Sequence, residues 1–376
     1  MIPFIDLATQ RVRIADKIDA AIARVLKHGQ YIFGPEVREL EAKLAAFCGA
    51  KHCIANANGT DALVLPLWAW GVGAGDAVFC PSFTFAATAE IVPWVNATPV
   101  FVDVLPDTYN MDPASLEAAI AGVKREGRLN PRVVIAVDLF GQPADYPKIA
   151  AIAKKHGLKL IADSAQGFGC TLDGQHPMHW ADATTTSFFP AKPLGCYGDG
   201  GATLANDDAD TILMRSIAFH GASGDDKYNC ALIGMNSRLD AIQAAILLEK
   251  LAIFEDEIRA RNEVAARYNE MLAGLVKTPA VIAGGVSTWA QYTIETPDRD
   301  GLAAHLRTAE IPTAQYYPKP LHKQSAYQEF PIGAGGMAVS EDIAKRVLAL
   351  PMHPYLDAPT QERITGAIRN FVKAGA

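Results

Sequence analysis

The sequence lacks the signals of a membrane protein, a metal centre or a disulfide-rich domain. No apolar run approaches the ~18 residues of a membrane span, and a charge interrupts the segment Met1–Leu7 too early for a signal peptide. The six cysteines show neither C-x-x-C spacing nor the intervals to histidines that zinc sites use. We therefore expect a cytoplasmic protein with reduced thiols, no metal ion and no membrane partner.

Charge is also sparse, and its balance is acidic. Charged residues make up 20% of the 376 residues, hydrophobic residues make up 50%, and the formal net charge is -7. An acidic chain without a segment rich in lysine and arginine is a poor candidate for binding nucleic acid, so we expect no nucleic-acid partner. The length and the apolar content predict one large core and a second, smaller domain.

What the sequence does contain is an alternation of apolar runs with segments of helical periodicity. Helix-like segments such as 86–95 and 146–156 separate apolar runs at 78–80, 100–103, 133–138, 158–163 and 184–188. This order predicts an α/β fold with a mainly parallel sheet covered by helices on both faces. Ligands of such sheets bind beyond the carboxyl ends of the strands, where we expect Asp138, Asp163 and Ser187.

The C-terminal third has a different pattern. The helical stretch 239–275 contains no proline and is longer than an ordinary globular helix, so it fits two helices with a bend. The segments that follow predict a smaller α+β domain. These segments are 289–294, 301–309, 338–348 and 359–372. We therefore divide the chain into a large domain, residues 1–250, and a small C-terminal domain, residues 251–376.

Asp163, Gln166 and Lys192 have the spacing and the chemistry of a pyridoxal phosphate (PLP) site. A lysine holds the aldehyde of this cofactor as a Schiff base and, as a neutral amine, serves as a general base. A carboxylate such as Asp163 keeps the pyridine nitrogen protonated, and Gln166 would reach the phenolic oxygen. Each residue alone also fits an ordinary structural position, and only their combination indicates PLP.

A phosphate site and a stacking ring complete this expectation. The segment Asn58–Ala62 opens a helix-like stretch, so its backbone amides and the Thr60 hydroxyl fit either a phosphate cradle or a plain helix cap. Ser82 and Ser187 are both candidate phosphate ligands, and Ser187 is preferred because it is nearer the lysine. Phe85 fits either a ring stacked on the pyridine face or a core aromatic side chain.

Two further segments offer groups for a substrate. Arg238, in Asn236–Asp240, suits a carboxylate through its two-pronged donors, or else is a solvated arginine beside a helix cap. The loop 316–323 mixes aromatic and cationic residues, with Tyr317 and His322 as the candidate substrate ligands. This segment fits equally well a simple surface loop or a binding site for the base and the diphosphate of a nucleotide. The glycines of 71–75 precede a strand and lack G-x-G-x-x-G spacing, which argues against a nicotinamide cofactor.

Together these motifs resemble the DegT/DnrJ/EryC1/StrS family of sugar aminotransferases. The resemblance extends from Phe4 to Pro354, and its motifs are Gly59-Thr-Asp-Ala62, Pro81-x-Phe-Thr-Phe85, Asp163-x-Ala-Gln166, Ser187-Phe-x-x-x-Lys192, Gly198-Asp-Gly-Gly201 and Asn236-x-Arg238-Leu-Asp240. It implies the aspartate-aminotransferase-like architecture, PLP fold type I. It also implies a homodimer whose active sites are shared across the interface.

The resemblance also implies roles for individual residues. Lys192 is the Schiff-base lysine, Asp163 the partner of the ring nitrogen and Gln166 the ligand of the ring oxygen. Phe85 stacks on the ring. The residues around the cofactor phosphate are Gly59, Thr60, Asp61 and Ser187, together with Asn236 of the neighbouring subunit, from which Arg238 also comes.

Several longer stretches are similar to one branch of that family, and they are 18–34, 187–201, 236–251 and 317–321. Enzymes of this branch aminate a UDP-linked 3-keto N-acetylglucosaminuronic acid for surface polysaccharide, and the C6 carboxylate of that sugar gives Arg238 a partner. Two residues depart from the family pattern. Tyr316 stands where histidine is common, and Ser164 stands where alanine is usual, a change expected to be neutral.

The activity implied by the resemblance is a ping-pong transamination. L-Glutamate converts PLP to pyridoxamine phosphate (PMP) and leaves as 2-oxoglutarate, after which the keto nucleotide sugar takes the amine. The alternatives are an acceptor that is a 4-keto or a 6-deoxy sugar, a sugar dehydratase, which would carry histidine in place of Lys192, and a non-catalytic PLP-binding regulatory protein. The intact Lys192, Asp163 and Gln166 argue against the last two.

Overall fold

A mainly parallel sheet forms the centre of this computed structural model, which describes residues 2–223 and 226–374. Within those residues the sheet has seven strands in the order β1-β8-β7-β5-β4-β2-β3. The strands are β1 (His52–Asn56), β2 (Asp76–Pro81), β3 (Thr98–Val102), β4 (Asn130–Val137), β5 (Lys159–Asp163), β7 (Ala183–Ser187) and β8 (Gly201–Ala205). The strand β8 runs antiparallel to both of its neighbours, β1 and β7, and the other strand pairs of this sheet are parallel, which confirms the predicted sheet type.

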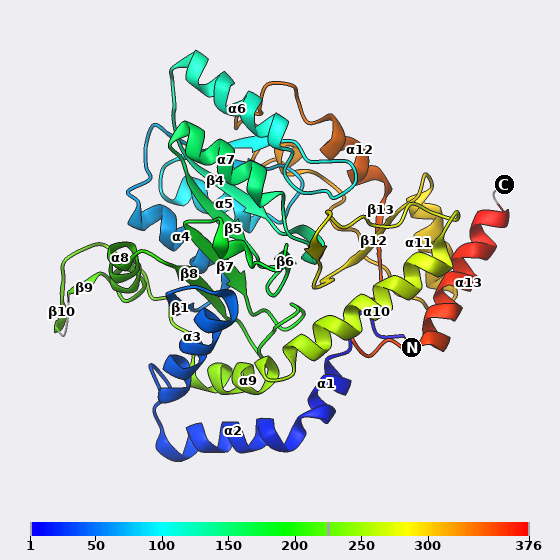
Figure 1. Cartoon of the computed structure of the whole chain (residues 1–376), viewed down its shortest axis with the longest axis horizontal. Coiled ribbons are helices and arrows are strands. Elements are labelled where there is room, and N and C mark those ends of the chain that lie inside the picture. The colour runs from blue at the N-terminus through cyan, green and yellow to red at the C-terminus, as the bar shows by residue number, and fades with distance from the viewer. Residues whose placement is uncertain (1, 224–225, 375–376) are drawn as a thin grey trace.

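Helices cover both faces of this sheet (Figure 1). Along β4, Val133 and Ile135 pack in the core beside α4 (Gly59–Ala69) and α5 (Ala87–Trp94). Val134 and Ala136 pack on the opposite face, beside α6 (Pro113–Glu126) and α7 (Tyr146–His156). Because successive side chains of a strand point to opposite faces, the unbroken apolar run of β4 belongs to a strand that is buried on both sides.

The predicted long helical stretch is two helices, α9 (Ala241–Leu251) and α10 (Phe254–Leu272). Phe254 and Ile258 at the start of α10 pack into the core that also contains α9, while Val264 and Tyr268 pack into the C-terminal core. The helix α10 therefore contributes to two cores. The division of the chain into residues 1–250 and 251–376 remains our proposal.

The C-terminal part is the expected smaller α+β unit. Its two-stranded sheet pairs β12 (Tyr292–Glu295) with β13 (Val347–Leu350) in antiparallel register. The helices that accompany this sheet are α11 (Arg299–Thr308), α12 (Ala338–Arg346) and α13 (Ala358–Ala374). A buried carboxylate ties this unit to the large sheet region, because Glu295 accepts a hydrogen bond from Tyr109 and pairs with Lys277 and Arg346.

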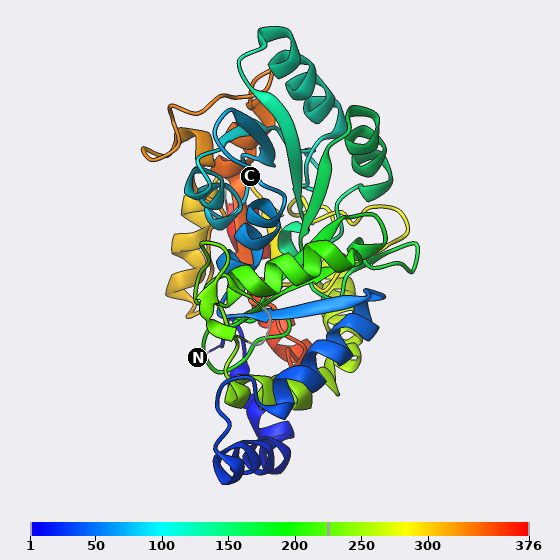
Figure 2. The ribbon, with the colours of Figure 1, turned by 90° about the vertical axis from the view of Figure 1, so that its left-hand side faces the viewer.

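The remaining elements lie around these two units. The N-terminal helices are α1 (Leu7–Arg13), α2 (Ala15–His28) and α3 (Pro35–Cys48), and Figure 2 shows the dark blue α2 at the lower end of the molecule, below α9. The helix α8 (Asp208–Ala218) precedes the hairpin of β9 (Ala222–Ser223) and β10 (Asp226–Cys230), and β6 (Thr171–Leu172) pairs with β11 (Gly285–Val286). None of the helices among the described residues is long and apolar enough to cross a membrane.

The carboxyl ends of β4, β5 and β7 meet at one edge of the sheet, as expected. Val137 at the end of β4 is the register partner of Asp163 at the end of β5, which in turn lies opposite Thr185 of β7. Ser187 ends β7. The sheet therefore brings the predicted residues at its strand ends together in space.

Candidate active site

A cavity of about 430 Å³ lies beyond the carboxyl ends of these strands. Its lining brings together most of the residues predicted from the sequence, and these are Gly59, Thr60, Phe85, Asp163, Gln166, Ser187, Lys192 and Tyr317. The large sheet region supplies all of them except Tyr317, which comes from the C-terminal part of the chain. The walls also contain Thr84, Thr88 and Asp199.

Lys192 extends into the cavity from the tight turn that follows β7. The backbone amide of Lys192 donates to the carbonyl oxygen of Phe189 at 2.8 Å, which closes this turn. Burial lowers the pKa of the Lys192 amine, while the negative charge of Asp163 raises it to a lesser extent. A lowered pKa increases the fraction of neutral amine, which is the form that attacks a carbonyl carbon or accepts a proton.

Asp163 ends β5 and is almost completely buried. Its Oδ2 accepts a hydrogen bond from Thr88 Oγ1 at 2.8 Å, and its Oδ1 accepts one from the amide of Ala165 at 3.2 Å. Burial raises the pKa of Asp163, whereas these donors and the nearby Lys192 lower it. The carboxylate therefore faces the cavity as a desolvated group that interacts strongly with any cationic group placed there.

A second buried carboxylate, Asp138, lies behind Asp163. Ser164 Oγ donates to its Oδ2 at 2.5 Å, and Tyr146 donates to its Oδ1 at 2.8 Å. Burial raises the pKa of Asp138 to about 7 in spite of these donors. Ser164, which departs from the family pattern, thus has a defined partner, because its hydroxyl ties the turn after β5 to the end of β4.

Gln166 is held in one orientation on the wall of the cavity. Its Oε1 accepts from the backbone amide of Phe140 at 2.9 Å, and its Nε2 donates to the Tyr317 hydroxyl at 2.9 Å. The rings of Phe85 and Tyr317 lie 6.4 Å apart between centroids. Phe85 is 55% exposed, so its ring is available to a ligand and is not a core aromatic side chain.

The start of α4 and the end of β7 form the end of the cavity that suits a phosphate. The first-turn amides of Gly59 and Thr60 have no acceptor within the helix, while the Asn58 side chain caps the amide of Asp61 at 2.8 Å. A Cβ atom on Gly59 would lie 2.6 Å from the Cβ of Ser187. Only glycine allows this approach, so the backbone and the Ser187 hydroxyl form one cradle for an anion.

These features fit PLP. An amine of lowered pKa, a buried carboxylate, an oriented amide and a cradle at a helix start surround one cavity of suitable chemistry. Ser187 lines the cavity, whereas Ser82 is fully buried elsewhere, so the structure favours Ser187 of the two candidate phosphate ligands.

Asn236 and Arg238 are not brought to this cavity in the same chain. They line a neighbouring cavity of about 400 Å³, and Asp199 belongs to the walls of both. The guanidinium of Arg238 lies over the ring of Phe219 at 5.6 Å from its centroid.

Asp61 also lies outside the first cavity. Burial raises the pKa of its carboxyl group, although hydrogen bonds from Ser237 and Asn58 lower that pKa to a lesser extent.

His322 also lies outside the cavity, contrary to its expected place beside a substrate. Its Nδ1 lies 2.6 Å from Ser82 Oγ, and its Nε2 lies 3.0 Å from Glu341 Oε1. The side chain is buried between these two partners. Such an arrangement fixes the loop that contains His322 against the end of β2, and it leaves the imidazole no free edge toward a ligand in the cavity.

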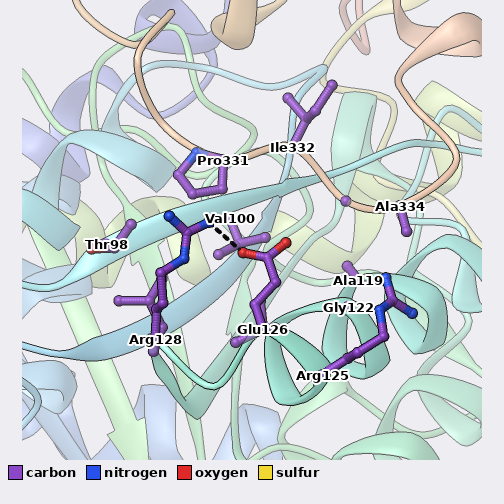
Figure 3. Close-up of a pocket in the computed structure, with 13 residues that line it drawn as sticks. Thr98, Val100, Ala119, Gly122, Arg125, Glu126, Arg128, Pro331, Ile332 and Ala334 are labelled. Atoms are coloured by element: carbon purple, nitrogen blue, oxygen red, sulfur yellow. Dashed lines mark hydrogen bonds and ion pairs between the residues drawn. The ribbon is translucent and has the colours of Figure 1, made fainter.

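Another cavity, of about 390 Å³, lies between the end of α6 and the segment 331–334, at the β3 edge of the sheet (Figure 3). Its charged residues are Arg125, Glu126 and Arg128, and the last two form an ion pair of 2.6 Å. None of the predicted site residues lines it. It offers no amine of lowered pKa and no buried carboxylate, so it is not the candidate active site.

Sequence reasoning missed several residues of the first cavity. Thr84, Thr88 and Gln291 line it, and Thr88 hydrogen-bonds directly to Asp163. The signal for the threonines was weak: they flank the start of a helix-like segment after an apolar run, but Thr84 precedes α5, so helical spacing does not apply to it. Gln291 carried no such signal, since it lies in a short loop before β12.

Comparisons with known proteins agree with this geometry. The chain matches the DegT/DnrJ/EryC1/StrS aminotransferase family over residues 12–369. It is 49% identical over 371 residues to the UDP-2-acetamido-2-deoxy-3-oxo-D-glucuronate aminotransferase of Pseudomonas aeruginosa, an alignment that covers 98% of this chain and 100% of that protein.

Solved structures show the same architecture. A DegT DnrJ EryC1 StrS aminotransferase from Brucella abortus is 54% identical, with a TM-score of 0.97 and coverage of 99% of each chain. The NtdA protein of Bacillus subtilis, solved with its cofactor PMP bound, is 28% identical with a TM-score of 0.86, covering 98% of this chain and 83% of that one.

Proposed function

This chain belongs to the DegT/DnrJ/EryC1/StrS aminotransferase family, and we propose that it transfers the amino group of L-glutamate to C3 of a UDP-linked 2-acetamido-3-keto-glucuronate. It is a PLP-dependent enzyme, as the family is. The observation that carries the proposal is the cavity in which Lys192, Asp163 and Gln166 converge, in a chain 49% identical to a 3-oxo-glucuronate aminotransferase. The product would be an amino-uronic acid for surface polysaccharide such as lipopolysaccharide.

The residues that would hold the cofactor follow from the cavity. Lys192 would bond to its aldehyde carbon, Asp163 would face its ring nitrogen, and Gln166 would face its ring oxygen. The phosphate ligands would be Gly59, Thr60 and Ser187, with Asp61 fixing the helix start behind them. The ring of Phe85 would cover one face. When bound, PLP supplies an electron sink for the negative charge that develops at carbon when a proton leaves.

Lys192 then has a second task, as the group that moves protons. Its Nζ would take the proton from Cα of L-glutamate in the first half-reaction and deliver one to C3 of the sugar in the second. Burial, which lowers the pKa of Lys192, favours the neutral amine that must accept the first proton. The negative charge of Asp163 would stabilise the positive charge on the ring nitrogen throughout.

A homodimer with shared active sites would complete the substrate pocket. Asn236 and Arg238 line a cavity beside the one that contains Lys192, so in a paired arrangement they would serve the partner's cofactor and sugar. Exposed apolar side chains accompany this region, and they are Tyr31, Ile32, Phe33 and Tyr197. Such a surface is typical of an interface between subunits. Tyr317 would contact the substrate from within the same chain.

The proposed location is the cytoplasm, where nucleotide sugars and reduced thiols occur together. The six cysteines are free, and all but Cys230 are buried. Thiols in this state suit a reducing compartment.

The activity can be tested in two half-reactions with the purified holoenzyme. L-Glutamate alone should shift the visible absorbance of the bound cofactor and release 2-oxoglutarate. Of a panel of keto nucleotide sugars, the UDP-linked 3-keto uronate should then restore the original absorbance and gain an amine, which mass spectrometry detects. A protein without cofactor absorbance would contradict the enzyme assignment. A preference for a 4-keto or a 6-deoxy sugar would contradict the proposed acceptor.

Arg238→Ala separates a uronate acceptor from a sugar without a carboxylate. Loss of a charged hydrogen bond should reduce kcat/KM for the UDP-linked uronate about ten- to a hundredfold, because such bonds contribute about 1.5–3 kcal/mol. The rate with a neutral 6-deoxy analogue and the half-reaction with L-glutamate should change little. Arg132→Ala serves as the control, because Arg132 lies near the amino end of β4 and lines neither of these two cavities. Equal losses with the uronate and the analogue would remove the argument for a carboxylate contact.

A further inference from the structure

Two threonine hydroxyls in the cavity wall form a chain of hydrogen bonds that ends on Asp163. Thr88 Oγ1 is 2.8 Å from Asp163 Oδ2, and Thr84 Oγ1 is 3.2 Å from Thr88 Oγ1. Both threonines are 2% exposed or less. In the described part of the chain, Thr88 provides the one side-chain hydrogen bond that Asp163 accepts.

The chemistry of the groups sets the direction of this line. An ionised carboxylate can only accept hydrogen bonds, so Thr88 must donate its one hydroxyl hydrogen to Asp163. The oxygen of Thr88 then accepts from Thr84. Hydrogen bonds linked in this way polarise one another, most of all in a buried setting. The pair forms a short relay that ends on the carboxylate.

The local sequence explains why these hydroxyls are available. Thr84 lies in the turn after β2, and Thr88 lies four residues later in the first turn of α5. A threonine within a helix often donates to a carbonyl oxygen of the preceding turn, but here the Thr88 hydroxyl donates to Asp163. Branching at Cβ restricts the χ1 angle of threonine to a few values, so the helix limits the positions that the Thr88 hydroxyl oxygen can take.

The surroundings of Asp163 make one donor important. Burial raises the pKa of Asp163, and the Thr88 hydrogen bond is the foremost influence that lowers it. Among the described residues, the ionisable groups with an identified electrostatic influence on or from Asp163 are Lys192, Asp138, Tyr317 and Tyr146. Of these only Lys192 is cationic, so the charged carboxylate depends also on its two neutral donors, the Thr88 hydroxyl at 2.8 Å and the Ala165 amide at 3.2 Å.

We propose that Thr88, supported by Thr84, is a positioning residue that orients the Asp163 carboxylate toward the ring nitrogen of the cofactor and keeps it ionised. The inference rests on the proposed function, because it takes the cofactor to be PLP. Its effect is indirect, since Thr88 acts on the cofactor through Asp163.

The test compares Thr88→Val with two matched variants. Valine keeps the shape of threonine and removes the donor, while Thr88→Ser keeps the donor. Thr185→Val is the control, because Thr185 is also buried, lies opposite Asp163 in the sheet register, and has a hydroxyl with no partner among the described residues. The readouts are the Kd of the apo protein for PLP, from protein fluorescence, and the pH dependence of the bound cofactor's absorbance.

Thr88→Val should weaken PLP binding about tenfold or more and should shift the absorbance titration, whereas Thr88→Ser and Thr185→Val should resemble the wild type. Thr84→Val should shift the absorbance titration in the same direction by a smaller amount, and it provides the test if Thr88→Val does not fold. Wild-type behaviour of the folded valine variants would overturn the inference. A wild-type protein that binds no PLP would overturn the proposed function instead.

Discussion

Lys192→Met is expected to abolish transamination, with a loss of about 10³-fold or more in both half-reactions. Methionine has a similar length and fits a buried site, so the fold should persist. The variant removes both the amine that bonds to the cofactor and the base that moves the proton. The measurements are the release of 2-oxoglutarate from L-glutamate and borohydride fixation of PLP to the protein, read by mass spectrometry.

Lys148→Met is the control, because Lys148 is an exposed lysine that, among the described residues, forms an ion pair with Asp145 alone, near the start of α7. It should retain full activity and full fixation of PLP. Fixation of PLP to the Lys192→Met protein at another lysine, with activity retained, would assign the covalent role to that residue. Activity without fixation would show that the protein works without a lysine bound to the cofactor.

The sheet and the core of the site could be predicted because both depend on local sequence. The apolar run of β4 identified a strand that is buried on both faces, and the polar residue after each strand identified the edge at which ligands bind. Asp163, Ser187 and Lys192 therefore fell into one cavity, as expected. In this part of the chain, spacing along the sequence determines position in space.

The parts that could not be predicted depend on contacts between distant segments. His322 pairs with Ser82 across 240 residues, and nothing in the loop 316–323 distinguished a histidine buried by such a contact from one facing a substrate. Thr88 and Asp163 are 75 residues apart. Arg238 was expected to cross to a neighbouring subunit, which stays a prediction; within the chain it lines a cavity separate from that of Lys192.

Tyr317 lines the cavity, whereas His322 does not. Tyr317 has a hydroxyl that reaches the oriented amide of Gln166, and its ring lies near that of Phe85. The C-terminal unit thus closes the cavity with an aromatic wall. A wall of this kind excludes water from one side of the reacting atoms and strengthens the electrostatic interactions there.

Asp163→Asn is expected to reduce kcat about 10²- to 10³-fold, the range seen when one preorganised electrostatic partner is removed. Asparagine keeps the size of the side chain and an oxygen for the Thr88 hydroxyl, but it carries no charge to keep the ring nitrogen protonated. The negative charge of Asp163 raises the pKa of Lys192. Its loss should therefore lower that pKa further and leave the amine more fully neutral.

The loss of the ring-nitrogen proton and the lower pKa of Lys192 should thus separate attachment of the cofactor from catalysis. Asp163→Asn should still fix PLP on borohydride reduction. In the apo protein the reaction of Lys192 with added PLP should persist to lower pH than in the wild type, because the free amine gains its proton only at lower pH. Turnover should nevertheless fall by about 10²- to 10³-fold, since proton removal from Cα of L-glutamate is assisted by the protonated ring. Asp145→Asn, at a helix cap outside the cavity, should behave as the wild type. An Asp163→Asn enzyme with near-normal kcat would mean that another group protonates the ring nitrogen.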